Sequence, residues 1–144
     1  MNQSKADELA KACADAMYTR DLATQALGIS IIEIRQGYAC MKMKVRADML
    51  NGHEICHGGF IFALADNAFA YACNTHNKVT VAQGCDIDFL QAGKKDDELS
   101  AVAEERKRSG RTGIYDVTVS RADGEVLALF RGRSYQLKGS LLKE

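Results

Sequence analysis

One segment constrains the fold of this chain more than any other, an almost uninterrupted apolar run from Phe60 to Cys73. Its alanine and leucine content and its length predict a helix. Only Asp66 and Asn67 interrupt the apolar character, so this helix is hydrophobic on nearly every side. A helix of that kind has to be buried over most of its surface. The rest of the chain must therefore wrap around it.

The segments on either side predict how it is wrapped. From about Ser4 to Ala26 apolar residues recur at helical spacing, which indicates an N-terminal helix with Ser4 as its N-cap and Gly28 just beyond its end. The other segments alternate with period two and predict strands joined by short polar turns. These strands are Ile29–Arg35, Tyr38–Arg46, Val79–Leu90, Glu98–Arg108, Gly113–Arg121 and Glu125–Leu137. We therefore predict an α+β fold over residues 1–144, a single domain with an antiparallel sheet wrapped around one long central helix and an additional helix at residues 4–26.

Charge and cysteine content exclude several classes of function. The 144 residues carry 19 Lys and Arg against 19 Asp and Glu, so the formal net charge is zero and no basic footprint for nucleic acid or an anionic membrane exists. No run approaches the ~20 apolar residues of a membrane helix. The five cysteines include no C-x-x-C pair, which disfavours a zinc ribbon or a redox site. Because the N-terminus lacks the apolar core of a signal peptide, we expect a cytoplasmic protein with reduced thiols.

Asp66 is the strongest candidate for a catalytic residue in this sequence. A carboxylate inside an apolar helix is costly unless it is paired, hydrogen-bonded or open to a wet cavity. It is therefore either a hydrogen-bonded structural group or a general base or nucleophile with a pKa shifted by burial. The spacing favours the second interpretation. Gly58 and Gly59 stand at the start of the helix, and Asp66, two turns further on, shares a face with Gly59 and Phe62.

The two glycines predict a site that polarises a carbonyl group. Glycine at a helix N-terminus leaves backbone N–H groups open to a ligand oxygen, and the helix dipole favours negative charge there. An acyl oxygen could sit on the N–H of Gly58 while Asp66 activates a water molecule. Two turns of helix separate these groups by ~10 Å. A two-fold interface that pairs Gly58 of one subunit with Asp66 of another would close the gap.

The run from His53 to His57 matches the zinc-protease pattern H-E-x-x-H. That chemistry needs both histidines one turn apart on a regular helix. Gly52 before the run and Gly58 after it disfavour such a helix, and His76 is the only other histidine in the sequence. A nucleophilic pair of Cys56 and His57 is also disfavoured, because neighbours in sequence rarely form a catalytic dyad. We therefore expect no metal and no cysteine nucleophile.

Several of these residues together resemble a known family. The pattern starts at Asn51, continues with His57-Gly58-Gly59 and reaches Asp66 after six further residues. The later segments Asp86-Ile87-Asp88-Phe89-Leu90 and Arg108-Ser109-Gly110-Arg111-Thr112 fit as well, so the resemblance covers roughly residues 28–137. The chain resembles the hotdog-fold thioesterases, and within them it is most similar to the phenylacetate-degradation PaaI type.

The resemblance implies an acyl-CoA thioesterase that hydrolyses aryl-acetyl thioesters such as hydroxylated phenylacetyl-CoA. It implies that Asp66 is the catalytic carboxylate and that the N–H of Gly58 forms the oxyanion site. Asn51 would position the attacking water or the thioester, and His57 would support the loop and thioester binding. In the family Asp66 comes from one subunit and the other three residues from its partner. The resemblance thus implies a homodimer with shared active sites that pairs again into a tetramer.

The resemblance also implies where the substrate lies. Gly59 would contact the substrate, and Phe62, Phe69 and Tyr71 could line an acyl pocket, although aromatic side chains on a buried helix are more often part of the core. Arg108, Ser109, Gly110, Arg111 and Thr112 would lie near the coenzyme A arm. Lys94 and Lys95 are weaker candidates for the phosphates, and a solvated turn is the simpler interpretation of both. No metal or redox cofactor is required.

Two departures from the family pattern stand out. Gln91-Ala92-Gly93 replaces a proline that many relatives carry after the Asp86–Leu90 strand, and Ala82 stands where some relatives place a Ser or Thr beside the catalytic Asp, with Thr80 close by. The alternatives are a thioesterase for medium-chain or long-chain fatty acyl-CoA, a non-catalytic acyl-CoA-binding hotdog module and a hotdog dehydratase. An intact Asp66 argues against the binding module, because a pure binder has no need of that carboxylate.

Overall fold

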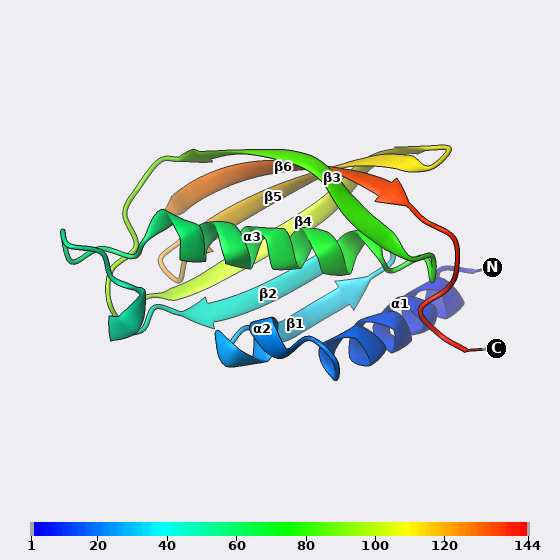
Figure 1. Ribbon diagram of the computed structural model, residues 1–144, viewed down its shortest axis with the longest axis horizontal. Helices are drawn as coiled ribbons and strands as arrows, with labels where there is room; N and C mark the ends of the chain where they lie inside the picture. Colours follow the sequence, from blue (N-terminus) through cyan, green and yellow to red (C-terminus); the bar gives the residue numbers. More distant parts are fainter. Residues whose placement is uncertain (1, 144) are drawn as a thin grey trace.

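A computed structural model describes residues 2–143 and contains one six-stranded sheet folded around one helix (Figure 1). The helices are α1 (Gln3–Tyr18), α2 (Leu22–Ala26) and α3 (Gly58–Cys73), with a 3-10 turn at Ala47–Met49. The strands are β1 (Ser30–Arg35), β2 (Tyr38–Lys44), β3 (Thr80–Phe89), β4 (Glu98–Ser109), β5 (Thr112–Arg121) and β6 (Val126–Gln136). All neighbours are antiparallel, in the order β1-β2-β4-β5-β6-β3. The predicted α+β hotdog fold is confirmed.

The central helix is buried as its composition predicts. In Figure 1 α3 lies along the sheet, with β2, β4, β5, β6 and β3 curving around it. Leu64, Ala65 and Ala68 are fully buried and belong to the same hydrophobic core as Met41 and Met43 of β2. Against β6 the approach is close, because the ring of Phe69 rests on the backbone at Gly132. No helix among residues 2–143 has both the length and the apolar character needed to cross a membrane.

The single helix predicted for residues 4–26 is wrong, because the segment forms two helices. The chain turns after Tyr18, and Asp21 begins α2 by accepting a hydrogen bond from the N–H of Thr24. Aspartate is a strong N-cap residue, which explains why a new helix starts there. The cap of α1 is Asn2 and not Ser4, since the Asn2 side chain accepts from the N–H of Lys5.

The short helix α2 fastens the N-terminal segment to the central helix. The hydroxyl of Thr24 donates a hydrogen bond to Asn67 of α3. One helical turn further, the hydroxyl of Tyr71 donates to the Asp21 carboxylate at 3.1 Å. These contacts give Asn67, one of the two polar interruptions of α3, a structural role. Gly28 then reverses the chain toward β1 with a φ of 70°, a conformation that glycine adopts without strain.

The predicted strands are confirmed with shifts of one or two residues at their ends. The helix α3 starts two residues before the predicted Phe60, because His57 caps it. The two edges of the sheet differ. Along β1 the helix α1 packs alongside, whereas β3 has no strand beyond it among the described residues. Val81 and Phe89 of β3 are 43% and 52% exposed, so this edge carries bare apolar side chains.

Candidate active site

The N-terminus of α3 is held in place from both sides. The N–H of Cys56 donates to the carbonyl of Gly93 at 2.7 Å, and the N–H of His57 donates to the carbonyl of Met49 at 2.8 Å. The His57 ring then caps the helix, since its Nδ1 accepts from the N–H of Gly59 at 3.3 Å. The N–H of Gly58 lies in the first turn, where backbone donors have no partner within a helix. The predicted carbonyl-polarising position is therefore a well-anchored helix terminus.

Asn51 organises the loop in front of this terminus. Its side-chain oxygen accepts from the N–H groups of His53 at 2.9 Å and Ile55 at 3.3 Å. Its own N–H donates to the carbonyl of Ile55 at 2.9 Å, which closes the loop. The carboxamide oxygen is thus used within the loop. The group that Asn51 can offer to a ligand is its Nδ2 donor.

A pocket of about 340 Å³ opens beside Gly58. It is lined by Asn51, Ile55, Cys56, Gly58, Ile61, Phe89, Leu90, Gln91 and Ala92. The residues from Phe89 to Ala92 come from the end of β3 and the following loop, and their place in the site was not predicted. The one signal in the sequence is an apolar Phe-Leu pair at the end of a predicted strand, and in the structure both side chains are more than half exposed.

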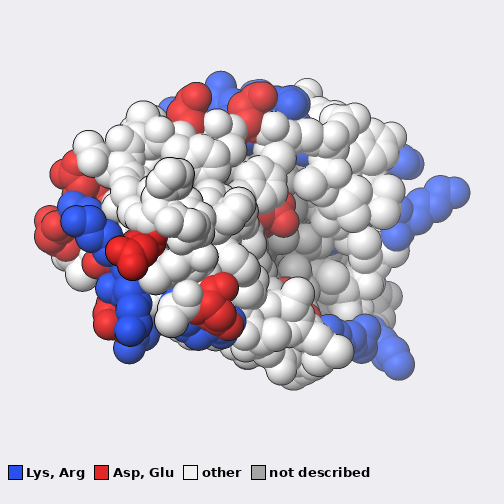
Figure 2. Space-filling model, turned by 60° about the vertical axis from the view of Figure 1, so that its left-hand side comes forward, with Lys and Arg blue, Asp and Glu red and all other residues white. Residues whose placement is uncertain are grey.

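Gly58 gives this pocket its depth. A Cβ atom at this position would lie 3.2 Å from the ring of Phe89, which is closer than an ordinary contact. Figure 2 shows the molecule turned toward this end: uncharged side chains cover much of this face, most charged side chains lie around its margin, and acidic atoms show in a recess near the middle. The pocket therefore offers apolar walls together with backbone and amide donors.

Asp66 lies about two turns along α3 from this pocket. It is half-buried, and burial raises the pKa of its carboxyl group, with no other cause acting on it. The thiol of Cys85 on β3 lies near Asp66, a proximity that was not predicted: burial, and after it the charge of Asp66, raise the pKa of that thiol. A half-buried carboxylate with a raised pKa and no ion-pair partner within residues 2–143 is a better proton acceptor than an ordinary aspartate.

One protomer does not bring Asp66 and Gly58 together. Eight residues of helix separate them by about 12 Å along the axis. Asp66 is also absent from the residues that line the pocket beside Gly58. The gap inferred from the sequence is thus present in the folded chain.

The aromatic residues of α3 belong largely to the core. Phe69 and Tyr71 are each 1% exposed, and Phe69 packs between Tyr115 and Phe130. Phe62 is only half-buried and meets the ring of Phe130 edge-on at 5.6 Å. Of the three, only Phe62 has a surface left for a ligand.

The turn from Arg108 to Thr112 lies at the other end of the molecule. It joins β4 to β5 and sits beyond the C-terminal end of α3 in Figure 1, far from the pocket beside Gly58. Gly110 makes the turn with a φ of 60°, and the hydroxyl of Thr112 donates to the carbonyl of Ser109. Lys94 and Lys95 are exposed in the loop before β4, next to Asp96 and Asp97. That acidic setting favours a solvated turn.

The structure also shows the setting of the H-E-x-x-H run and of the Ala82 departure. The H-E-x-x-H run from His53 to His57 ends where α3 begins and is not helical, and residues 2–143 hold no group of three side chains placed to bind a metal ion. Ala82 is exposed on β3, and the hydroxyl of nearby Thr80 is used by the carbonyl of Lys78. No hydroxyl from these two positions reaches Asp66.

The fold and this arrangement define a hotdog-fold thioesterase. The chain belongs to the thioesterase superfamily, whose family model matches residues 53–128, and this places it among the thioester hydrolases. It is 47% identical over 131 residues to the acyl-coenzyme A thioesterase PaaI of Escherichia coli, covering 91% of this chain and 94% of that protein. A putative esterase of Archaeoglobus fulgidus is 34% identical, covering 93% of this chain and 87% of the relative.

Solved structures agree with this assignment. The E. coli PaaI protein from the phenylacetic acid degradation operon superposes with a TM-score of 0.92 at 46% identity, covering 93% of this chain and 97% of that one. A hypothetical thioesterase protein of Streptococcus pneumoniae, solved with coenzyme A, superposes with a TM-score of 0.74 at 25% identity, covering 78% of this chain and 90% of that one. The chain is therefore similar to PaaI over nearly its whole length.

Proposed function

We propose that this protein hydrolyses aryl-acetyl-CoA thioesters, such as phenylacetyl-CoA and its hydroxylated forms, to the free acid and coenzyme A. The observation that carries the proposal is Asp66, a half-buried carboxylate with a raised pKa on the same helix whose first N–H groups open into a pocket. The similarity to the E. coli acyl-coenzyme A thioesterase PaaI supports the substrate class. The proposal places the enzyme in the cytoplasm, in keeping with five cysteines that are free thiols.

The chemistry needs few groups. As a general base, Asp66 takes a proton from water while the water oxygen attacks the thioester carbon, and the resulting oxyanion accepts a hydrogen bond from the N–H of Gly58. The C–S bond then breaks, and the coenzyme A thiolate leaves and takes up the proton. As a nucleophile, Asp66 would instead form a mixed anhydride that water opens. No metal or redox cofactor takes part in either route.

Asn51 and His57 have supporting roles in this scheme. The Nδ2 group of Asn51 is the donor that the loop leaves available, so it suits a water molecule or the thioester. His57 holds the N-terminus of α3 through the N–H of Gly59, and this fixes the direction of the N–H of Gly58. Gly59 and Phe62 continue the same surface toward Asp66, and the turn from Arg108 to Thr112 contacts the coenzyme A arm.

The proposed active site combines two protomers. Asp66 comes from one chain, and Asn51, His57 and Gly58 come from its partner, because about 12 Å separates the two groups within one chain. The bare edge at β3, with Val81 and Phe89 exposed, supports pairing at this side of the sheet. A homodimer, and from it a dimer of dimers, is therefore part of the proposal.

The activity is tested with purified protein and phenylacetyl-CoA, with release of free thiol as the signal. A panel of straight-chain acyl-CoA esters decides between aryl and fatty acyl preference. Asp66→Asn should lower kcat by about 100- to 10,000-fold, the usual contribution of a general base. Equal thiol release by the wild type and this variant would refute the assignment. Single turnover in ¹⁸O-labelled water separates the routes, since label enters the Asp66 carboxyl group only if an anhydride forms.

The shared site is tested by mixing two inactive variants. Neither Asp66→Asn nor Asn51→Ala is expected to turn over substrate well alone, but a mixed dimer contains one site with both native groups. Random exchange of subunits should restore about a quarter of the wild-type activity. A mixture no more active than its components, with exchange verified by mass spectrometry, would place both groups in one chain's site.

A further inference from the structure

The short helix α2 is hydrogen-bonded to α3 next to Asp66. The hydroxyl of Thr24 donates to the side-chain oxygen of Asn67, the residue that follows Asp66 in the sequence. The hydroxyl of Tyr71, one turn further along α3, donates to the carboxylate of Asp21 at 3.1 Å. The two hydrogen bonds therefore hold the stretch of α3 that carries Asp66.

The contact between Thr24 and Asn67 is shielded from solvent. Thr24 is 1% exposed, so a lost partner of its hydroxyl would not readily be replaced by water. The amide group of Asn67 is also used, because it donates to the carbonyl of Ala63 at 2.8 Å. A buried polar group left without a partner costs the full penalty of its desolvation. The contact therefore resists separation of α2 from α3.

The helix α2 is itself fixed to the body of the protein. Asp21 caps it by accepting from the N–H of Thr24 at 3.2 Å, so one carboxylate serves both helices. At the other end of α2 the carbonyl of Ala26 accepts from the guanidinium of Arg46, just after β2, at 2.8 Å. The carbonyl of Thr24 accepts from the N–H of Ile29 at 3.1 Å. A firmly held element thus meets α3 on the side of Asn67.

The sheet holds the opposite side of α3. Successive residues of a helix are about 100° apart around its axis, so Asn67 and Phe69 point in directions about 200° apart. Phe69 is the residue that rests on Gly132 of β6. The buried neighbours Ala65 and Ala68 offer only methyl groups, which pack without a directional bond. The sheet therefore sets how closely α3 approaches, and the hydrogen bonds to α2 set the rotation of α3 about its own axis.

Within residues 2–143 no hydrogen bond or ion pair holds the Asp66 carboxyl group, and burial is the only cause acting on its pKa. The place of this group therefore follows the rotation of α3. A side chain reaches about 5 Å from the helix axis, so a rotation of about 10° moves the carboxylate by about 1 Å. A displacement of about 1 Å at a catalytic group can lower a rate by about 100-fold.

We propose that α2 positions the catalytic carboxylate, with Thr24 as a positioning residue that acts on Asp66 through Asn67. Asp21 acts in the same way through Tyr71. The proposal rests on the proposed function, because it assigns the catalytic role to Asp66. Neither Thr24 nor Asp21 lines the pocket beside Gly58, so loss of these contacts should lower kcat and leave KM nearly unchanged.

The test uses a pair of variants that differ in one hydroxyl group. Thr24→Val removes the hydroxyl and keeps the volume of the side chain, whereas Thr24→Ser keeps the hydroxyl. With phenylacetyl-CoA, Thr24→Val should lower kcat by about 10- to 100-fold and change KM by less than about twofold. Thr24→Ser should keep kcat close to the wild-type value. Tyr71→Phe removes the second hydrogen bond and should also lower kcat, and it serves as the test if Thr24→Val does not fold.

Thr75→Val is the matched control. Thr75 is also a buried threonine, whose hydroxyl donates to the carbonyl of Ala72 at 2.7 Å and accepts from the N–H of Gly37 at 2.8 Å. It lies beyond the C-terminal end of α3, away from Asp66. This variant should lower Tm about as much as Thr24→Val does and leave kcat unchanged. If both valine variants lower kcat equally, or if Thr24→Ser is as slow as Thr24→Val, the proposal is wrong.

A second measurement needs no substrate. The ¹³C resonance of the Asp66 carboxyl group, assigned by its absence from the spectrum of Asp66→Asn, reports the surroundings of this group. Thr24→Val should shift the resonance and Thr75→Val should not, and an unchanged resonance in Thr24→Val would overturn the proposal. Failure of the wild type to hydrolyse any thioester would instead count against the proposed function, so the two failures can be told apart.

Discussion

The contact between Gly132 and Phe69 sets how closely the central helix approaches the sheet, and it predicts a large effect for a single methyl group. A Cβ atom at Gly132 would lie 2.7, 2.7 and 2.8 Å from three carbons of the Phe69 ring. The ring cannot swing away, since it is 1% exposed and packs against Tyr115 at 5.6 Å and Phe130 at 5.8 Å. The helix or the strand must therefore move.

Overpacking of a closed core costs about 1–3 kcal/mol, and three simultaneous contacts below 3 Å place Gly132→Ala near the upper limit. A loss of about 2–3 kcal/mol corresponds to a fall in Tm of about 5–10 °C for a domain of this size. Because Asp66 lies one turn before Phe69 on the same helix, kcat should fall as well. Urea denaturation followed by circular dichroism measures the free energy of unfolding, and thiol release measures kcat.

Gly52→Ala is the control, because a Cβ at Gly52 meets nothing within 4 Å. It should leave the free energy of unfolding within about 0.5 kcal/mol of the wild type. In the double variant G132A/F69L the smaller side chain leaves room for the methyl group, so its loss should be less than the sum of the two single losses. A Gly132→Ala protein as stable as the wild type would show that the helix does not depend on this contact.

Three further predictions concern charged and polar groups. Burial raises the folded-state pKa of Asp66, so its unfavourable effect on stability begins as the pH rises through the ordinary pKa of an aspartate, which the unfolded chain has, and is complete above the raised pKa of the folded state. Asp66→Asn should therefore raise Tm at pH 7 and not at pH 3. Burial acts to raise the pKa of Glu105, but the hydrogen bonds with His76 and Tyr115 outweigh burial, so the pKa of this carboxyl group is lowered. Glu105→Gln should cost about 1–2 kcal/mol at pH 7, a difference that disappears as the pH falls through the folded-state pKa. Asn77→Gly allows the same backbone conformation but removes the side-chain oxygen that accepts from the N–H groups of Leu141 and Leu142. In a hydrogen-exchange measurement these two amides should therefore exchange faster, without a comparable change in α3.

The central helix and the strands were predictable because their signals are local. An apolar run with one carboxylate and alternating strands fix element types through periodicity alone. The break after Tyr18 was missed, because it depends on Asp21 both capping α2 and accepting a hydrogen bond from Tyr71, which lies 50 residues away. Side-chain periodicity continues across such a break and gives no sign of it.

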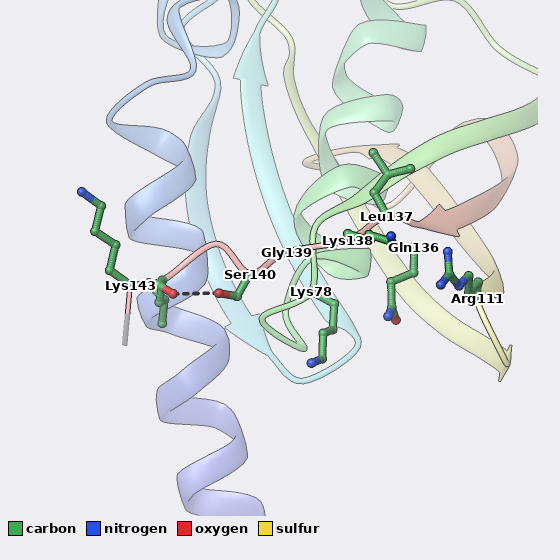
Figure 3. Close-up of a pocket in the computed structure, with 9 residues that line it drawn as sticks. Lys78, Arg111, Gln136, Leu137, Lys138, Gly139, Ser140 and Lys143 are labelled. Atoms are coloured by element: carbon green, nitrogen blue, oxygen red, sulfur yellow. Dashed lines mark hydrogen bonds between the residues drawn. The ribbon is translucent and has the colours of Figure 1, made fainter.

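The two pockets show the same limit. Asp66 and Gly58 could be selected from spacing on one helix, whereas Phe89 joins the pocket only because the Cys56 N–H bonds the carbonyl of Gly93. Lys78 and Lys138 line a second pocket, which forms where β3 begins and β6 ends (Figure 3). A single sequence does not predict that these two lysines lie together, because their proximity depends on the register between distant strands. Nothing in the neighbouring sequence distinguishes them from solvated lysines.

The two edges of the sheet differ, and this difference limits how many chains can join by strand pairing. At β1, α1 packs alongside, the ladder is bulged between Ile31 and Glu33, and Glu33 pairs with Arg35, so this edge does not accept another strand. The outer edge of β3 pairs with no strand among residues 2–143. Strand pairing through this one edge would join two chains into a closed pair, so a dimer of dimers has to form through other surfaces. A substitution that uncovers β1 would give each chain a second free edge and allow strand pairing to continue into a fibre.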